Sequence, residues 1–82
     1  MLIDIKKVTM KQNILNLLTE ALPAVDFESD FLFSELDSLG IVTILVILSK
    51  EYNISLDAMD VTPRNFRSID TIVSMVEAKL AK

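Results

Sequence analysis

The stretch Leu36-Asp37-Ser38-Leu39-Gly40 lies where a polar segment gives way to a long apolar run. Asp37 belongs to the residue types that most often cap the N-terminus of a helix, and its charge suits the positive end of the helix dipole. Asn53 suits a C-terminal stop. The pattern therefore predicts a helix over residues 38–52 with Ser38 in its first turn. The serine hydroxyl would be open to an approaching enzyme, which makes Ser38 a candidate point of covalent attachment.

The predicted helix is apolar on two sides. The side expected to face the core carries Ile41, Ile44, Leu45, Leu48 and Tyr52. The nearly opposite side carries Leu39, Val42 and Val46, which we call the outer stripe. A helix with two apolar sides must be buried all round or must meet a partner. Because full burial is difficult in so small a chain, we expect the outer stripe to bind a partner; the alternative is that residues 24–36 bury it.

The composition excludes several classes of site. The chain of 82 residues has no cysteine and no histidine, so disulfides, thiolate or histidine-ligated metal sites and a Ser–His–Asp triad are excluded. A small enzyme would have to work with carboxylates alone, and no paired acidic constellation stands out, so we expect no catalytic residue and no enzyme. The net charge of −4 disfavours nucleic acid as a partner and suits a basic surface on another protein.

The whole chain, residues 1–82, has the length of a single domain. Glycine and proline are rare, and apolar residues recur at helical spacing without clean alternation, which predicts an all-α fold. The N-terminal segment is interrupted by Asp4 too early for a signal peptide, and the longest unbroken apolar run, residues 44–48, is too short to span a bilayer. We therefore expect a cytoplasmic protein with no membrane span.

Two further helices are expected on either side of the central one. The first is expected over residues 4–22, or from Thr9 if the preceding residues are frayed, and Pro23 ends it. Its expected core residues are Met10, Ile14, Leu17, Leu18 and Ala21. The last helix is expected over residues 69–80, with Ser68 as its N-cap. Its expected core residues are Ile69, Ile72, Val73, Val76 and Leu80.

The segment over residues 24–36 is too apolar for a solvated linker. We expect some of Phe27, Phe31 and Phe33 to pack onto the helices as core residues rather than as a ligand pocket. A loop this long is unusual in a compact domain, and a single helical turn within it would account for it. Its acidic residues lack the pattern of a calcium loop, so we expect a solvated face. They are Asp26, Glu28, Asp30 and Glu35. Residues 60–66 should form a loop or one short turn.

Taken in this order, the elements make the chain similar to the acyl carrier protein family. The specific motif is Asp37-Ser38-Leu39 at the start of the central helix. It is followed at the family's spacing by Val42, Ile44, Leu48 and Tyr52, and then by Ile54 and Leu56 of a short hydrophobic stretch. The resemblance covers nearly the whole chain. It implies a small four-helix bundle with three main helices and one short helix.

The resemblance also implies a cofactor. In the family, the serine at the position of Ser38 receives 4′-phosphopantetheine from coenzyme A through a phosphopantetheinyl transferase. Asp37 and Leu39 complete the motif, and Asp37 would help the transferase to orient the serine and the metal-bound coenzyme A. The thiol of the arm would hold an acyl or aminoacyl group as a thioester, although the chain has no cysteine. The chain would be a monomeric substrate of the transferase, a loading ligase and downstream acyl-transfer enzymes, with no metal of its own.

The resemblance further suggests how cargo and partners are recognised. An acyl cavity would be lined by Ile44, Leu48, Phe33, Phe66, Ile69 and Val73. Carriers of fatty-acid synthesis have an acidic second helix; here the corresponding positions include Gly40, Thr43, Ser49 and Lys50. Docking should therefore depend less on charge and more on the outer stripe. Gly40 directly after the motif is similar to carriers of aminoacyl groups and of specialised lipid or secondary-metabolite pathways, such as D-alanyl carrier proteins, rather than to housekeeping fatty-acid carriers.

The alternative function is an unmodified helical interaction module that holds a partner through the outer stripe, Leu39, Val42 and Val46. Ser38 would then be only part of the helix cap, a role for which Asp37 also competes. The two hypotheses differ in their response to mutation. Ser38→Ala would leave such a module functional, whereas aspartate at position 42 or 46 would abolish its binding.

Overall fold

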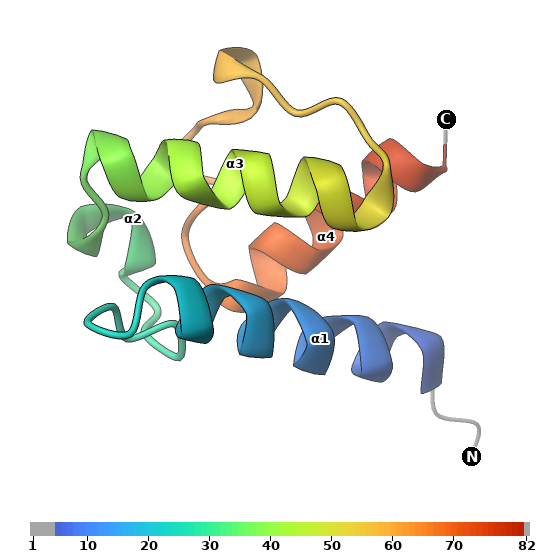
Figure 1. Ribbon diagram of the computed structural model, residues 1–82, viewed down its shortest axis with the longest axis horizontal. Helices are drawn as coiled ribbons and strands as arrows, with labels where there is room; N and C mark the ends of the chain where they lie inside the picture. Colours follow the sequence, from blue (N-terminus) through green and yellow to red (C-terminus); the bar gives the residue numbers. More distant parts are fainter. Residues whose placement is uncertain (1–4, 82) are drawn as a thin grey trace.

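The computed structural model describes residues 5–81, with side chains described from residue 9 onward. These residues form α1 (Ile5–Ala21), α2 (Leu32–Glu35), α3 (Ser38–Tyr52), the 3₁₀ helix η1 (Ala58–Asp60) and α4 (Ile69–Leu80) (Figure 1). No strand occurs among them, which confirms the predicted all-α fold of three main helices with a short one, and η1 adds a second short element. Within this part of the chain, no helix has the length and apolarity needed to cross a lipid bilayer.

The three long helices pack against one another around a single core. α1 and α3 lie side by side and run in opposite directions, and α4 crosses behind them (Figure 1). The end of α1 and the start of α3 therefore lie at the same end of the molecule, close to α2. The largest fully buried side chains are Phe27, Phe66, Ile14, Leu18, Leu32, Ile44, Leu48, Ile72, Val73 and Val76.

The limits of α3 and α4 agree with the predicted ranges. α3 ends at Tyr52 and is capped by Asn53, whose φ of 52° is a left-handed conformation that asparagine tolerates well. The Asn53 N–H donates to the Ser49 carbonyl oxygen. α4 begins after Ser68, whose hydroxyl oxygen accepts a hydrogen bond from the Thr71 N–H, while the Thr71 hydroxyl oxygen accepts one from the Ser68 N–H. These caps are local, which is why both ranges could be predicted without knowledge of the packing.

α1 differs in detail from its predicted range. Asp4, the expected first residue, lies outside the described residues. The helix is already formed at Ile5, so the alternative start at Thr9 is wrong. At the other end the helix stops at Ala21, one residue before the prediction, and the Leu22 N–H still donates to the Leu18 carbonyl oxygen at 2.8 Å. Helix ends commonly differ from predictions by this much.

The expected core residues that are buried are Ile14, Leu18, Ile44, Leu48, Ile69, Ile72, Val73 and Val76, and those that are half-buried against the core are Met10, Ile41, Leu45 and Tyr52. Leu17 is a correction, because it is only half-buried and does not pack with this core. Ala21 of α1 and Leu80 of α4 are exposed, because each is the last residue of its helix, where neighbouring elements no longer cover it. Met75, which the predicted stripe of α4 omits, is buried. Since α4 packs against both α1 and α3, a wider part of its circumference is covered than a one-sided stripe would require.

The connection between α1 and α3 is tied to the core, as expected from its aromatic residues. Phe27 is buried and Phe33 is half-buried, whereas Phe31 remains exposed. The connection contains a single helical turn, α2, and the Leu32 N–H at its start donates to the Arg67 carbonyl oxygen at 2.9 Å. The connection is therefore joined to the segment before α4, and the helical turn shortens the irregular part of the loop.

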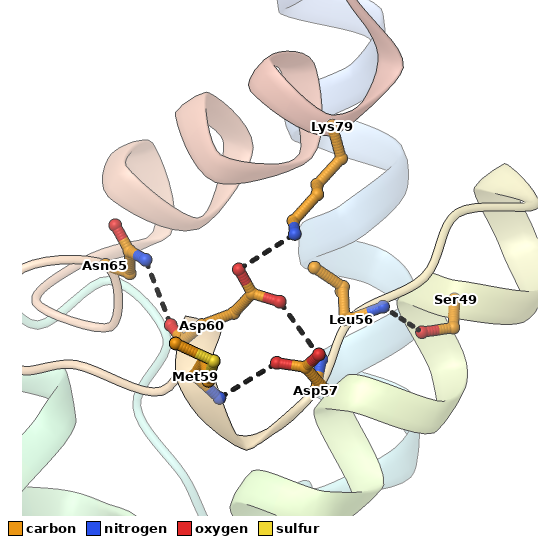
Figure 2. A network of polar contacts seen from close by, with 7 residues as sticks. All are labelled: Ser49, Leu56, Asp57, Met59, Asp60, Asn65 and Lys79. Atoms are coloured by element: carbon orange, nitrogen blue, oxygen red, sulfur yellow. Dashed lines mark hydrogen bonds and ion pairs between the residues drawn. The ribbon is translucent and has the colours of Figure 1, made fainter. Parts of the chain in front are cut away.

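A network of polar contacts holds the connection between α3 and α4 (Figure 2). On the side of α3, the Leu56 N–H donates to Ser49 Oγ at 3.4 Å. In η1, Asp57 and Asp60 form a reciprocal capping box, in which the Asp57 N–H donates to Asp60 Oδ2 at 3.0 Å. On the side of α4, Lys79 Nζ lies 3.1 Å from Asp60 Oδ1. The connection is thus fastened to both helices between which it runs.

The turn expected in residues 60–66 is present. The Phe66 N–H donates to the Thr62 carbonyl oxygen at 3.1 Å, which closes a turn around Pro63. Two contacts of Asn65 support it: its N–H donates to Thr62 Oγ1 at 3.0 Å, and its Nδ2 donates to the Asp60 carbonyl oxygen at 2.9 Å. The turn brings Phe66 into the core, directly before α4.

Candidate functional site

Ser38 is the first residue of α3, and Asp37 is the residue that caps this helix. The backbone of Asp37 is extended, and its Oδ1 accepts a hydrogen bond from the Gly40 N–H at 2.7 Å. Its carbonyl oxygen accepts a bond from the Ile41 N–H at 3.0 Å. From the sequence, either Asp37 or Ser38 could provide the cap. The geometry assigns the cap to Asp37, in the ordinary manner of an N-terminal aspartate.

The side chain of Ser38 is exposed and takes no part in the cap. Within the residues that the structure describes, no hydrogen bond involves its hydroxyl group. The cap therefore does not depend on this hydroxyl, and a group bonded to Ser38 Oγ would extend from the surface rather than into the core. Chemically, this is a primary alcohol that another molecule can reach without any change in the fold.

The start of α3 also suits a phosphate group. The first N–H groups of a helix have no partner within it, and the aligned peptide dipoles place a partial positive charge there. Because Asp37 Oδ1 takes the Gly40 N–H, the N–H groups of Ser38 and Leu39 are the ones that remain without a partner in this helix. Phosphate groups bind at helix N-termini for these reasons. The residues present therefore fit a phosphate ester on Ser38 Oγ.

The outer stripe is exposed along α3. The relative exposure is 74% for Leu39, 52% for Val42 and 47% for Val46. The alternative in which residues 24–36 bury this stripe is therefore wrong. That segment packs instead through Phe27 and Leu32, which are directed into the core. The stripe begins at the residue after Ser38 and continues along two turns of the helix, so a surface suited to binding adjoins the exposed hydroxyl.

Among the described residues, two of the surface hollows border α3. One, which we call the distal groove, lies between α3 and the connection that follows it, has a volume of about 360 Å³, and is lined in part by Val42, Val46 and Leu56. The other, which we call the proximal cleft, lies at the start of α3 and has a volume of about 400 Å³. Its lining includes Asp37 and Gly40, which flank Ser38 in the sequence. Of these two hollows, the proximal cleft is the one that reaches Asp37, the residue before the exposed serine.

Sequence reasoning did not anticipate the proximal cleft. The single glycine of the chain, Gly40, was a signal for it, because an isolated glycine within a helix commonly has a packing or functional reason. In the structure Gly40 is buried, although it lies only two residues after the exposed Ser38. The cleft itself requires the end of α1 to lie against the start of α3, which no local pattern reveals.

The six residues that the resemblance suggested for an acyl cavity mostly lie in the core. Ile44, Leu48, Phe66, Ile69 and Val73 are buried, and Phe33 is half-buried. None of the six lines the distal groove or the proximal cleft. Their role as an acyl cavity stays a prediction. Among the described residues, no group of three or more histidine, cysteine, aspartate or glutamate side chains is placed to hold a metal ion.

Comparison with known protein families agrees with this geometry. The chain matches the family described as phosphopantetheine attachment site over residues 10–78, which is most of its length and includes the start of α3. No curated protein and no solved structure gave a significant match. The family is defined by its covalently attached 4′-phosphopantetheine group, and the helical fold agrees with it. The chain therefore belongs to the phosphopantetheine attachment site family, and so is a carrier domain of the acyl carrier protein type.

Proposed function

We propose that this chain carries an acyl or aminoacyl group on a 4′-phosphopantetheine arm attached to Ser38. The observation that supports this most is the state of the Ser38 hydroxyl, which is exposed at the first residue of α3 and left unused by the cap that Asp37 forms. Membership of the family supports the arm. The choice of Ser38 rests on the Asp37-Ser38-Leu39 motif and on this geometry.

The attachment reaction assigns a clear task to each residue. Ser38 Oγ would form a bond to the β-phosphorus of coenzyme A and lose its proton to a base of the transferase, while the phosphoanhydride bond breaks and adenosine 3′,5′-bisphosphate leaves. Asp37 keeps the helix capped through Gly40, so the position of the serine is fixed. The N–H groups at the start of α3 would hold the phosphate of the attached group. The arm, once attached, would supply the thiol that binds the cargo.

The outer stripe is the proposed docking surface for enzymes that modify, load or unload the carrier. It starts at Leu39, next to the attachment point, so an enzyme bound there would have Ser38 within reach. Such enzymes are a phosphopantetheinyl transferase, a loading ligase and acyl-transfer enzymes. The flanking Lys50 is exposed, and α3 lacks the many acidic residues that fatty-acid carriers have on this helix. Recognition through apolar contacts is therefore favoured over recognition through charge. The chain would act in the cytoplasm, where coenzyme A is available, as a monomer.

A second candidate function is an unmodified interaction module, which would bind its partner through the outer stripe. The exposure of the stripe supports this function too, because it does not depend on modification of Ser38. The carrier proposal predicts a chemical change in the chain itself, and the module does not. A measurement of mass therefore separates the two.

The test is the intact mass of the purified chain after incubation with coenzyme A and a phosphopantetheinyl transferase of broad specificity. We expect the mass of the wild-type chain to rise by one phosphopantetheine and the mass of Ser38→Ala to stay unchanged. Ser74→Ala is the matched control, because Ser74 is another exposed helical serine, on α4, and should not affect the gain. Absence of any gain with several transferases would reject the carrier proposal, and a gain that persists in Ser38→Ala would reject the assigned residue.

A further inference from the structure

The proximal cleft lies beside the proposed attachment point. The end of α1 and the start of α3 meet at one end of the molecule (Figure 1). The apolar side chains lining the cleft include Leu22, Val25 and Leu36, with Glu35 and Asp37 adding carboxylates and Gly40 at the start of α3. The volume of about 400 Å³ lies within the range of pockets that hold small molecules. The wall is therefore mainly apolar, with hydrogen-bond acceptors.

Gly40 lies against the wall of this cleft and against the helix cap. A Cβ atom built on Gly40 would lie 3.2 Å from Asp37 Oδ1, 3.6 Å from Leu36 Cδ2 and 3.8 Å from Leu22 Cδ1. A larger residue would therefore press on the carboxylate that caps the helix, while its contacts with the two leucines would be ordinary ones. Glycine lowers the stability of a helix relative to alanine, so its presence here needs a reason outside the helix itself. The tight contact that a Cβ would make with the capping oxygen of Asp37 is such a reason.

We infer that the proximal cleft holds the part of the phosphopantetheine arm nearest to Ser38, the pantoyl group with its two geminal methyls. The inference rests on the proposed function, since it requires an arm on Ser38. The methyl-bearing carbon is separated from the phosphate by a single CH₂ group, so it cannot move far from the start of α3. A short tether gives the attached group an effective concentration of about millimolar near its attachment point. Even weak affinity of the cleft is then enough for occupancy.

The chemistry of the cleft matches this segment of the arm. The two methyl groups suit the apolar wall formed by Leu22, Val25 and Leu36. The adjoining hydroxyl and amide N–H are donors, and the carboxylates of Glu35 and Asp37 can accept from them. The same carboxylates repel the phosphate, which stays outside the cleft at the N–H groups that begin α3. Electrostatic repulsion would therefore keep the phosphate at the helix end, while the apolar carbon of the arm occupies the cleft.

The distal groove is the competing location, and it is less suited to this segment. Its lining begins at Val42, which is about 6 Å along the helix axis from Ser38, and extends away from the attachment point to Lys50. It also shares Val42 and Val46 with the outer stripe. An arm in the distal groove would therefore cover the surface proposed for partner enzymes, whereas an arm in the proximal cleft leaves that surface open.

The test is an isotope-filtered NMR experiment on the modified chain. The protein is labelled with ¹³C and ¹⁵N, and the arm is transferred from unlabelled coenzyme A, so that NOEs from the two arm methyls to the protein are observed selectively. We expect NOEs to the methyl groups of Leu22, Val25 and Leu36. NOEs to Val46 or Leu56 instead, or no NOEs at all from a chain whose mass shows the arm, would overturn the inference and leave the proposed function intact.

Paired variants sharpen the result. Val25→Asp places a carboxylate in the proximal cleft and should remove the NOEs, and Val25→Thr, which keeps the shape of valine, should weaken them without disturbing the fold. Val46→Asp, the matched change in the distal groove, should leave them unchanged. Equal loss in Val25→Asp and Val46→Asp would overturn the inference. A chain that gains no mass with any transferase would instead overturn the proposed function, so the two failures are distinguishable.

Discussion

α3 and α4 are both apolar helices, yet they bury different parts of their surface. The buried residues of α4 are Ile69, Ile72, Val73, Met75 and Val76, whereas those of α3 are Gly40, Ile44 and Leu48. α4 crosses behind α1 and α3 and packs against both (Figure 1). α3 instead keeps one side on the core, and its outer stripe is exposed to solvent. Apolar surface that folding leaves exposed indicates binding. The comparison thus separates a helix whose apolar surface is largely used by the fold from one that leaves part of its apolar surface exposed.

The largest expected effect is on stability, in a pair of truncations. Ile72→Ala in α4 removes a fully buried side chain and should cost about 2–5 kcal/mol of unfolding free energy, through lost burial and a remaining cavity. Val46→Ala in α3 shortens an exposed side chain and should change the unfolding free energy by less than about 0.5 kcal/mol. Urea denaturation of both variants measures the difference. Similar losses in the two would show that the outer stripe helps to hold the fold.

The second effect is on recognition. Val46→Asp places a charge in the outer stripe without touching Ser38, and should lower kcat/KM for modification by the transferase about tenfold, as expected when an apolar contact of a docking surface is lost. Ser74→Asp introduces the same charge on an exposed position of α4 and should leave the rate unchanged. Initial rates at varied carrier concentration measure both. An equal fall in the two variants would mean that net charge, and not the stripe, governs docking.

The smallest effect concerns the start of α3. Asp37→Ala removes the acceptor of the Gly40 N–H and should cost about 1 kcal/mol, whereas Asp37→Asn keeps an acceptor oxygen and should cost only a few tenths. Thermal unfolding of both variants checks this. If the asparagine variant is as unstable as the alanine variant, the carboxylate does more than cap the helix. If it is stable but modified slowly, the charge of Asp37 matters to the transferase.

Features that depend on a few neighbouring residues could be predicted. The limits of α3 and α4 follow from Asp37, Asn53 and Ser68, because a cap is made by groups within about four residues of the helix end. The candidate role of Ser38 followed from its place after such a cap. Burial at helix ends was predicted less well. Ala21 and Leu80 fit the apolar period of their helices but are exposed at the last residue of each. The period alone does not tell where a neighbouring helix stops covering the helix surface.

The sequence by itself determined the all-helical class, the limits of α3 and α4, and a second apolar side of α3 that had to be either covered or exposed. Only the tertiary structure decided between those two outcomes, because Phe27 and Leu32 direct the α1–α3 connection into the core and leave the outer stripe uncovered. It also produced the proximal cleft, since the end of α1 and the start of α3 are brought together by antiparallel packing. Caps are short-range hydrogen bonds, whereas coverage and clefts depend on which distant segments meet.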